Sequence, residues 1–125
     1  MLLVTFVGVG GFFGAVFRHL LSNWVQQVAG NPLWPYGTLA VNATGSLLLG
    51  ILVGLAEAKG LFSPEMRALL FVGVLGGFTT FSTFGVETST LLRQGSIIGA
   101  TANIVLQVLL GVGAAMAGYQ LSRLA

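Results

Sequence analysis

The charged residues of the chain are so few that they leave four long uncharged stretches between them. These stretches cover residues 1–17, 19–56, 68–86 and 94–122. A membrane-spanning helix needs about 20 predominantly apolar residues, so each stretch is long enough for one span. The pattern predicts an all-α membrane protein with four transmembrane helices in a single domain, residues 1–125. The expected spans are about 2–24, 36–56, 67–92 and 96–122.

Short polar segments separate the predicted spans. A loop is expected between Asn23 and Pro35, because amide side chains, a glycine and two prolines interrupt the apolar pattern there. Residues 57–67 gather acidic and basic side chains with Gly60 and Pro64, as a polar turn does. An even number of spans then leaves both termini on the same side of the membrane.

Composition supports a membrane protein and excludes several other classes. Hydrophobic residues make up 55% of the chain and charged residues only 6%, against roughly 25% in an ordinary soluble domain. This balance excludes a soluble monomer and a disordered chain. The five basic residues form no cluster, so no nucleic-acid partner is expected. No basic residue precedes the first apolar run, which we therefore interpret as a mature helix and not as a signal peptide.

Side chains suited to catalysis are scarce. The chain has no cysteine, no aspartate and a single histidine, His19. No nucleophile–base pair or paired carboxylates can be assembled from the spans, so the protein is not expected to be an enzyme. A proton-coupled pump is also disfavoured, because the spans lack a central carboxylate.

Residues 76–84, with the sequence GGFTTFSTF, are unusual for the middle of a membrane span. Two glycines followed by four hydroxyl residues disfavour a continuous helix, so we expect the third helix to be broken at mid-membrane. Freed carbonyls there would suit a small hard cation, and freed amides and hydroxyls an anion. The alternative is an unbroken helix whose hydroxyls bond to its own carbonyls.

Amide side chains occur inside two other spans. Asn42 lies deep in the second span, on one face with Thr38 and Ser46. Its NH2 group could donate to an anion or bond to a neighbouring helix. Asn103 and Gln107 share a face of the fourth span and form either a polar track or a helix-pairing device.

Two phenylalanines and one arginine complete the candidate residues. Phe81 and Phe84 are three apart and share one helical face. Their ring edges carry partial positive charge and could face a desolvated anion, although plain packing is the far commoner reason for such a pair. Arg18, at the end of the first predicted span, either snorkels to the headgroups or draws anions toward a pore mouth.

Glycine spacing and charge balance bear on assembly. Gly10 and Gly14, like Gly50 and Gly54, are four apart, a spacing that lets membrane helices pack closely. The end with the termini would carry Lys59, Arg67 and Arg123, and the other end Arg18 and Arg93. Such a small positive-inside bias leaves two interpretations open: a chain with few charges, or insertion in both orientations with antiparallel pairing.

The motif at 76–84, together with YGTLAVN at 36–42 and the spacing Gly14-x-x-x-Arg18, closely resembles the CrcB/Fluc fluoride channel family. The likeness covers nearly the whole chain. It implies an antiparallel, dual-topology homodimer in the inner cell membrane, with two pores that export toxic fluoride passively from the cytoplasm. It also implies a structural sodium ion (Na+) at the dimer centre, bound by the backbone carbonyls of Gly76 and Thr79.

The resemblance assigns roles to individual residues. The pore phenylalanines of the family match Phe81 and Phe84, its pore asparagine matches Asn42, and its pore-mouth arginine matches Arg18. A desolvated fluoride ion would need donors along this path, and the hydroxyls of Ser82 and Thr83 are candidates.

The fourth span matches the family more loosely. Asn103 and Gln107 correspond to its polar residues, but Gly111 stands where the family often has a serine. Two other functions remain as alternatives. A small multidrug-type exchanger needs a carboxylate in its first span, whereas the first acidic residue here is Glu57. A non-transporting membrane assembly subunit would need only the glycine packing.

Overall fold

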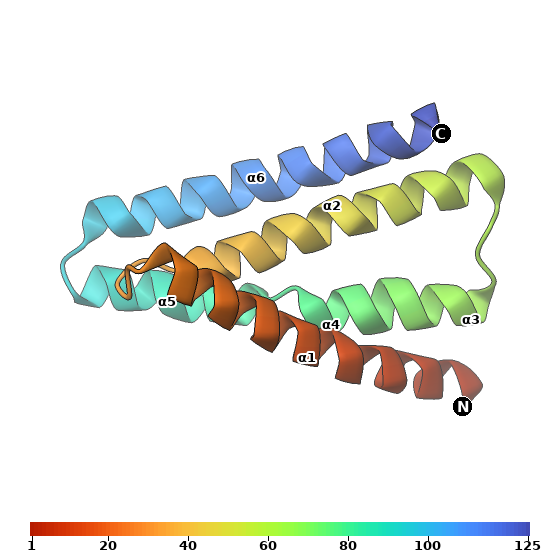
Figure 1. The fold of residues 1–125 in the computed structure, drawn as a ribbon, viewed down its shortest axis with the longest axis horizontal. Helices are drawn as coiled ribbons and strands as arrows, with labels where there is room; N and C mark the ends of the chain where they lie inside the picture. Colours follow the sequence, from red (N-terminus) through yellow and green to blue (C-terminus); the bar gives the residue numbers. More distant parts are fainter.

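The computed structural model describes residues 1–125 as a bundle of helices without strands (Figure 1). In chain order these are α1 (Leu2–Ala29), α2 (Tyr36–Lys59), α3 (Pro64–Arg67), the π-helical segment η1 (Ala68–Leu75), α4 (Gly76–Phe78), α5 (Phe81–Arg93) and α6 (Ile97–Leu124). The segments from α3 to α5 follow one another and form the third span, Pro64–Arg93. Four spans are long and apolar enough to cross a membrane, which confirms the prediction of an all-helical, multi-pass membrane protein.

The four spans run up and down the length of the bundle. Figure 1 shows both termini and the α2–α3 connection at one end, and the α1–α2 and α5–α6 connections at the other. The α5–α6 turn is tight and passes through Gly95, whose φ of 79° favours glycine.

Helix α1 is longer than the predicted first span and continues through the amide residues expected to start the loop. It ends at Ala29, before Gly30 with a φ of 67°. Amide side chains are compatible with a helix once it has left the hydrocarbon. Gln26 also organises the loop: its Nε2 donates to the Asn31 carbonyl at 2.7 Å, and its Oε1 accepts from Gly37 N at 3.1 Å.

Glycines bring the spans together in two pairs. Helix α1 packs on η1 and α4, and α2 packs on α6. A Cβ at Gly10 or Gly14 would collide with backbone atoms of the third span, and a Cβ at Gly50 would collide with the backbone of Ala115. Gly54 is likewise closed off by Ser122 on α6. The predicted close packing at both glycine pairs is therefore confirmed.

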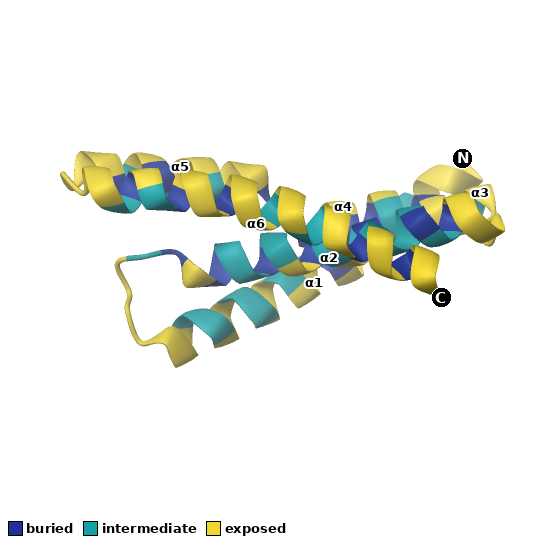
Figure 2. Ribbon diagram, turned by 90° about the horizontal axis from the view of Figure 1, so that it is seen from above, coloured by how far each residue is buried: buried dark blue, intermediate teal, exposed yellow.

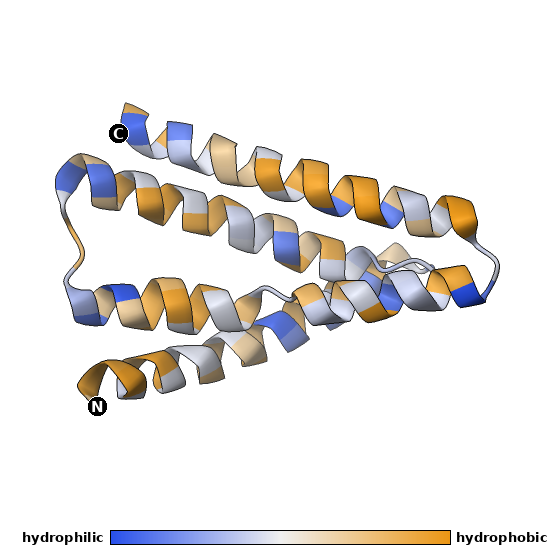
Figure 3. Cartoon of the chain, turned by 180° about the vertical axis from the view of Figure 1, so that it is seen from behind, coloured by the Kyte–Doolittle hydropathy of each residue, from blue (hydrophilic) through white to orange (hydrophobic).

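Little of the chain is buried within a single copy. Only 22 of 125 residues are buried, and most dark patches in Figure 2 lie where spans meet. Figure 3 shows hydrophobic segments along all the spans, with hydrophilic ones at their ends and near the middle of α2. The outer surface is thus suited to lipid or to another apolar surface.

Candidate functional site

The third span is interrupted at Thr79 and Thr80. Thr79 has φ −80° and ψ 156°, and Thr80 has φ −149° and ψ 116°, so both are extended. Figure 1 shows the interruption between α4 and α5, near the middle of the bundle's length. The alternative of one continuous helix over residues 76–84 is therefore wrong, because the helical hydrogen-bond pattern stops after α4.

Asn42 of α2 takes over the backbone hydrogen bonds that Thr80 has lost. Its Oδ1 accepts from Thr80 N at 2.8 Å, and its Nδ2 donates to the Thr80 carbonyl at 3.0 Å. An unpaired backbone group away from water is costly, so these two bonds stabilise the extended conformation. The Asn42 amide thus bonds to both backbone groups of Thr80.

Hydroxyl groups gather where α5 begins. Thr80 Oγ1 accepts from Thr83 N at 3.2 Å and caps the helix. The same oxygen lies 3.0 Å from Thr83 Oγ1 and 3.4 Å from Ser82 Oγ. The predicted hydroxyl donors Ser82 and Thr83 are therefore brought together around Thr80, which sequence reasoning did not single out.

The break also releases the two carbonyls assigned to sodium by the resemblance. In a continuous helix the Gly76 carbonyl would accept from Thr80 N, which here bonds to Asn42. The Thr79 carbonyl would accept from Thr83 N, which here bonds to Thr80 Oγ1. Carbonyl oxygens are ligands that hard cations prefer, so the chemistry of this pair fits the assignment.

Arg18 lies beside this break and not at the end of its span. Its Nη1 donates to the Thr79 carbonyl at 3.4 Å. The difference from the prediction arises because α1 continues well beyond Arg18, to Ala29. The guanidinium of Arg18 therefore sits next to the Thr79 carbonyl oxygen. Its positive charge would also attract an anion.

Gln107 of α6 is oriented by the same set of hydrogen bonds. Both hydrogens of Asn42 Nδ2 are used, one by the Thr80 carbonyl and one by Gln107 Oε1 at 3.0 Å. Gln107 must therefore turn its Nε2 the other way. That atom is buried and has no protein partner, in a side chain only 9% exposed. The arrangement presents an unused N–H donor.

Asn103, which was predicted to share this track, serves the contact between α5 and α6. Its Nδ2 donates to Thr88 Oγ1 at 2.9 Å, and Thr88 Oγ1 donates to the Phe84 carbonyl at 2.8 Å. Asn103 is fully buried and does not line the cavity that contains Gln107. Of the two alternatives for this residue, the geometry favours helix pairing.

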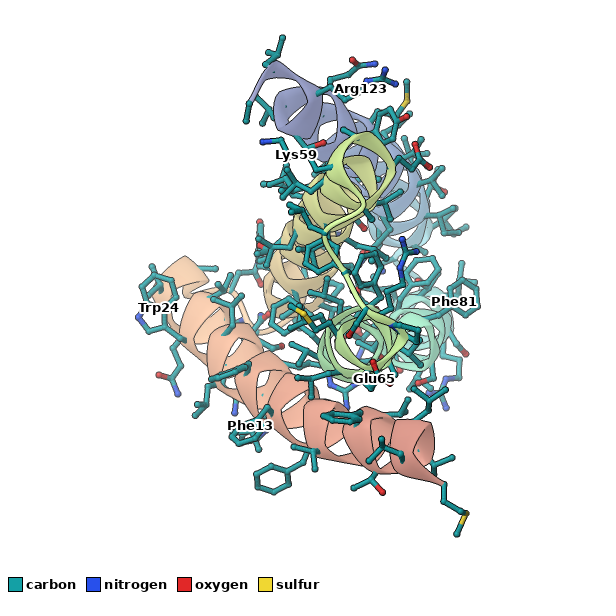
Figure 4. The ribbon with its side chains drawn as sticks, turned by 90° about the vertical axis from the view of Figure 1, so that its right-hand side faces the viewer. Phe13, Trp24, Lys59, Glu65, Phe81 and Arg123 are labelled. Carbon is teal, nitrogen blue, oxygen red and sulfur yellow. The ribbon has the colours of Figure 1, made fainter.

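Phe81 and Phe84 border an open groove on one side of the break. Their rings meet edge to face, with centroids 5.4 Å apart. Phe81 is 82% exposed and points away from the bundle in Figure 4. The groove has a volume of about 300 Å³ and brings together several of the predicted site residues. Its lining includes Asn42, Ser46, Thr79, Thr80, Phe81, Phe84, Gln107 and Gly111.

A second, more polar pocket lies on the other side of Thr80. It has a volume of about 200 Å³ and is lined by Arg18, Thr38, Thr80 and Thr83, among others. Thr80 lines both cavities, so the break separates the Arg18 pocket from the phenylalanine groove. The two cavities are therefore neighbours at the break.

Thr38 and Glu87 join this site without having been predicted in it. Thr38 Oγ1 donates to Glu87 Oε1 at 2.7 Å, linking α2 to α5. The available signal was the four-residue spacing of Thr38 from Asn42. Glu87 lies on α5, on the C-terminal side of the break, and this bond holds its side chain against α2. The structure brings no group of three or more His, Asp or Glu residues together.

Comparison with known proteins places the chain in a family. Residues 5–119 match the family model described as CrcB-like protein, Camphor Resistance (CrcB). The fluoride-specific ion channel FluC 1 of Methanosarcina acetivorans is 47% identical over 118 residues, covering 94% of this chain and 88% of that protein. The fluoride-specific ion channel FluC of Rhizobium meliloti is 46% identical over 120 residues, covering 96% and 95%. That of Shewanella loihica is 47% identical over 116 residues, covering 93% and 92%. The chain therefore belongs to the CrcB family.

Proposed function

We propose that this protein is a fluoride-selective passive channel that exports fluoride from the cytoplasm across the inner cell membrane. The names of its relatives support the substrate. The observation that carries the proposal is the buried, unpartnered Nε2 of Gln107 beside the helix break, because it is a hydrogen-bond donor without a protein acceptor.

Fluoride is small and strongly hydrated, so a path must replace its water with other donors. The Arg18 pocket offers a guanidinium and the hydroxyls of Thr80 and Thr83. Beyond the break, the Gln107 N–H and the edges of the two phenylalanine rings follow. Ring edges attract an anion only weakly, which lets the ion leave again. A narrow path with few donors would disfavour larger halides.

We infer that the functional unit is an antiparallel homodimer with two pores. One copy leaves its phenylalanine groove open, and Phe81 extends from it with 82% of its surface exposed. A second copy related by a two-fold axis would cover this groove and contribute aromatic edges of its own. The small number of basic residues in the chain supports insertion in both orientations.

A sodium ion at the dimer centre is the remaining part of the proposal. The carbonyls of Gly76 and Thr79 would hold it, together with the same pair from the second copy. The ion would neutralise partial negative charge on carbonyls that the break has freed. Arg18 already donates one hydrogen bond to the Thr79 carbonyl. This bond helps to hold residues 79 and 80 in their extended conformation.

Flux from liposomes tests the proposed function. The purified protein should release fluoride rapidly and chloride hardly at all, with empty liposomes as the control. Release of both halides at similar rates would contradict fluoride selectivity. Absence of any release from correctly folded, reconstituted protein would instead support a non-transporting assembly subunit, and drug-driven proton movement would support the exchanger.

A further inference from the structure

Two residues of α2, Ser46 and Leu49, line both the phenylalanine groove and the neighbouring cavity farther along the bundle. Of the two, only Ser46 is polar. This second cavity has a volume of about 580 Å³, lies between α2 and α6 and extends toward Tyr119 and Gln120. An ion that leaves Gln107 in this direction passes Ser46 before it reaches the polar groups at the end of α6.

The side chain of Ser46 is free to serve such an ion. The preceding polar residues on its face are paired: Thr38 bonds to Glu87, and Asn42 bonds to Thr80 and Gln107. Ser46 takes part in none of the side-chain hydrogen bonds of the structure, and it is half-buried at the groove. Its hydroxyl can therefore rotate and donate toward the cavity.

Gly111 of α6 lies opposite this hydroxyl. A Cβ added at Gly111 would have one neighbour within 4 Å, Ser46 Oγ at 3.8 Å, which is an ordinary contact. Position 111 thus has room for a small side chain that would reach the same part of the groove. Because α6 carries no side chain there, Ser46 is the hydroxyl available at this level.

We propose that Ser46 contacts the permeating anion and continues the donor path beyond Gln107, at the level where Gly111 leaves α6 without a donor. This inference rests on the proposed channel function. It predicts that the donor matters by its place in the groove and not by the helix that carries it. A hydroxyl moved from α2 to α6 should therefore work.

Fluoride flux of matched variants in liposomes tests the inference. Ser46→Ala should lower the flux by about five- to tenfold, the factor expected for one lost hydrogen bond. Adding Gly111→Ser to that variant should restore most of the flux, whereas adding Gly111→Ala, which lacks only the hydroxyl, should not. Thr44→Val removes a hydroxyl from the exposed face of the same helix and should leave the flux unchanged.

The isosteric pair Ser46→Thr and Ser46→Val gives a second comparison, in which only the variant with a hydroxyl should conduct well. Flux is normalised to the dimer recovered by size exclusion. If the wild-type protein carries no fluoride, the proposed function fails. If the wild-type protein conducts and Ser46→Ala conducts equally, or Gly111→Ala rescues as well as Gly111→Ser, the role of Ser46 is overturned while the channel function stands.

Discussion

At the scale of single residues, the polarity of the site is decided by a backbone amide. Thr80 N requires an acceptor, so Asn42 turns its oxygen toward it. Both hydrogens of the Asn42 amide then find acceptors, one of them Gln107 Oε1. Gln107 lines the groove, and its buried Nε2 is left as a donor without a protein acceptor. The extended Thr80 thus fixes which end of the Asn42 amide, and through it which end of the Gln107 amide, is the donor. A free donor at Gln107 suits a path for anions.

Gln107 and Asn103 should respond differently to truncation, although both are amides on one helix. Gln107→Ala should lower fluoride flux by about tenfold, since an ion loses one donor, with a small change in melting temperature. Asn103→Ala should mainly lower stability, by roughly 1–3 kcal/mol, because a buried hydrogen bond to Thr88 is lost. Flux per folded dimer and thermal unfolding in detergent separate the two. Equal effects of both variants on flux would contradict the division of roles.

Phe81 should be essential for conduction and dispensable for folding. Phe81→Ile removes the positive ring edge but keeps an apolar side chain on a largely exposed position. We expect fluoride efflux from liposomes to fall nearly to background, with the dimer intact. Phe13→Ile is the matched control, because Phe13 also points outward in Figure 4 but lies on α1, away from the groove. Wild-type flux in the Phe81 variant would remove the aromatic edges from the mechanism.

At the scale of elements, the third span is held in place by helix contacts on both sides of its break. Helix α1 packs on η1 and α4 through backbone-to-backbone contacts at Gly10 and Gly14. On the other side, α2 reaches the break with Asn42. The π-helical η1 has a wider turn than an α-helix, a feature often found at functional sites. The extended Thr79–Thr80 segment is therefore fixed by Asn42 and Arg18 of neighbouring helices as well as by local bonds such as that of Thr83 N to Thr80 Oγ1.

Close packing at Gly14 gives a prediction about stability. A Cβ at Gly14 would meet the Val74 carbonyl and the Phe78 amide, which are backbone atoms and cannot move aside easily. Gly14→Ala should lower stability by roughly 1–3 kcal/mol, as overpacking does. Gly113→Ala, which has nothing within 4 Å, should be neutral or slightly stabilising. Thermal unfolding in detergent measures both, and equal melting temperatures would show that α1 can shift freely.

Sequence patterns predict the spans and the helix break well because each depends on local preferences. Charge-free runs set the spans, and GGFTTFSTF disfavours a continuous helix. The orientation of Gln107 and the position of Arg18 beside Thr79 depend on contacts between helices far apart in sequence. No local pattern reports such contacts. For the same reason no local pattern indicates the hydrogen bond between Thr38 and Glu87.

At the scale of the whole molecule, the proposed channel needs a second copy. In one copy, two of the cavities share Thr80 in their lining, and the most exposed phenylalanine, Phe81, lines one of them. An antiparallel second copy would close the groove and double the path. Such a dimer requires that the chain insert in both directions. The chain has only five basic residues, which provide little bias for either direction.

Dual insertion can be measured directly because the chain has no cysteine. Leu61→Cys places a thiol in the α2–α3 connection, and Gln94→Cys places one at the opposite end of the bundle; both residues are exposed and uncharged. A membrane-impermeant maleimide added outside intact cells should label about half of the copies at each position, since each orientation is about equally favourable. Permeabilised cells, in which all copies should react, provide the control. Complete labelling at one position with none at the other would mean a single orientation, and the antiparallel dimer would then be excluded, since its two copies must cross the membrane in opposite directions.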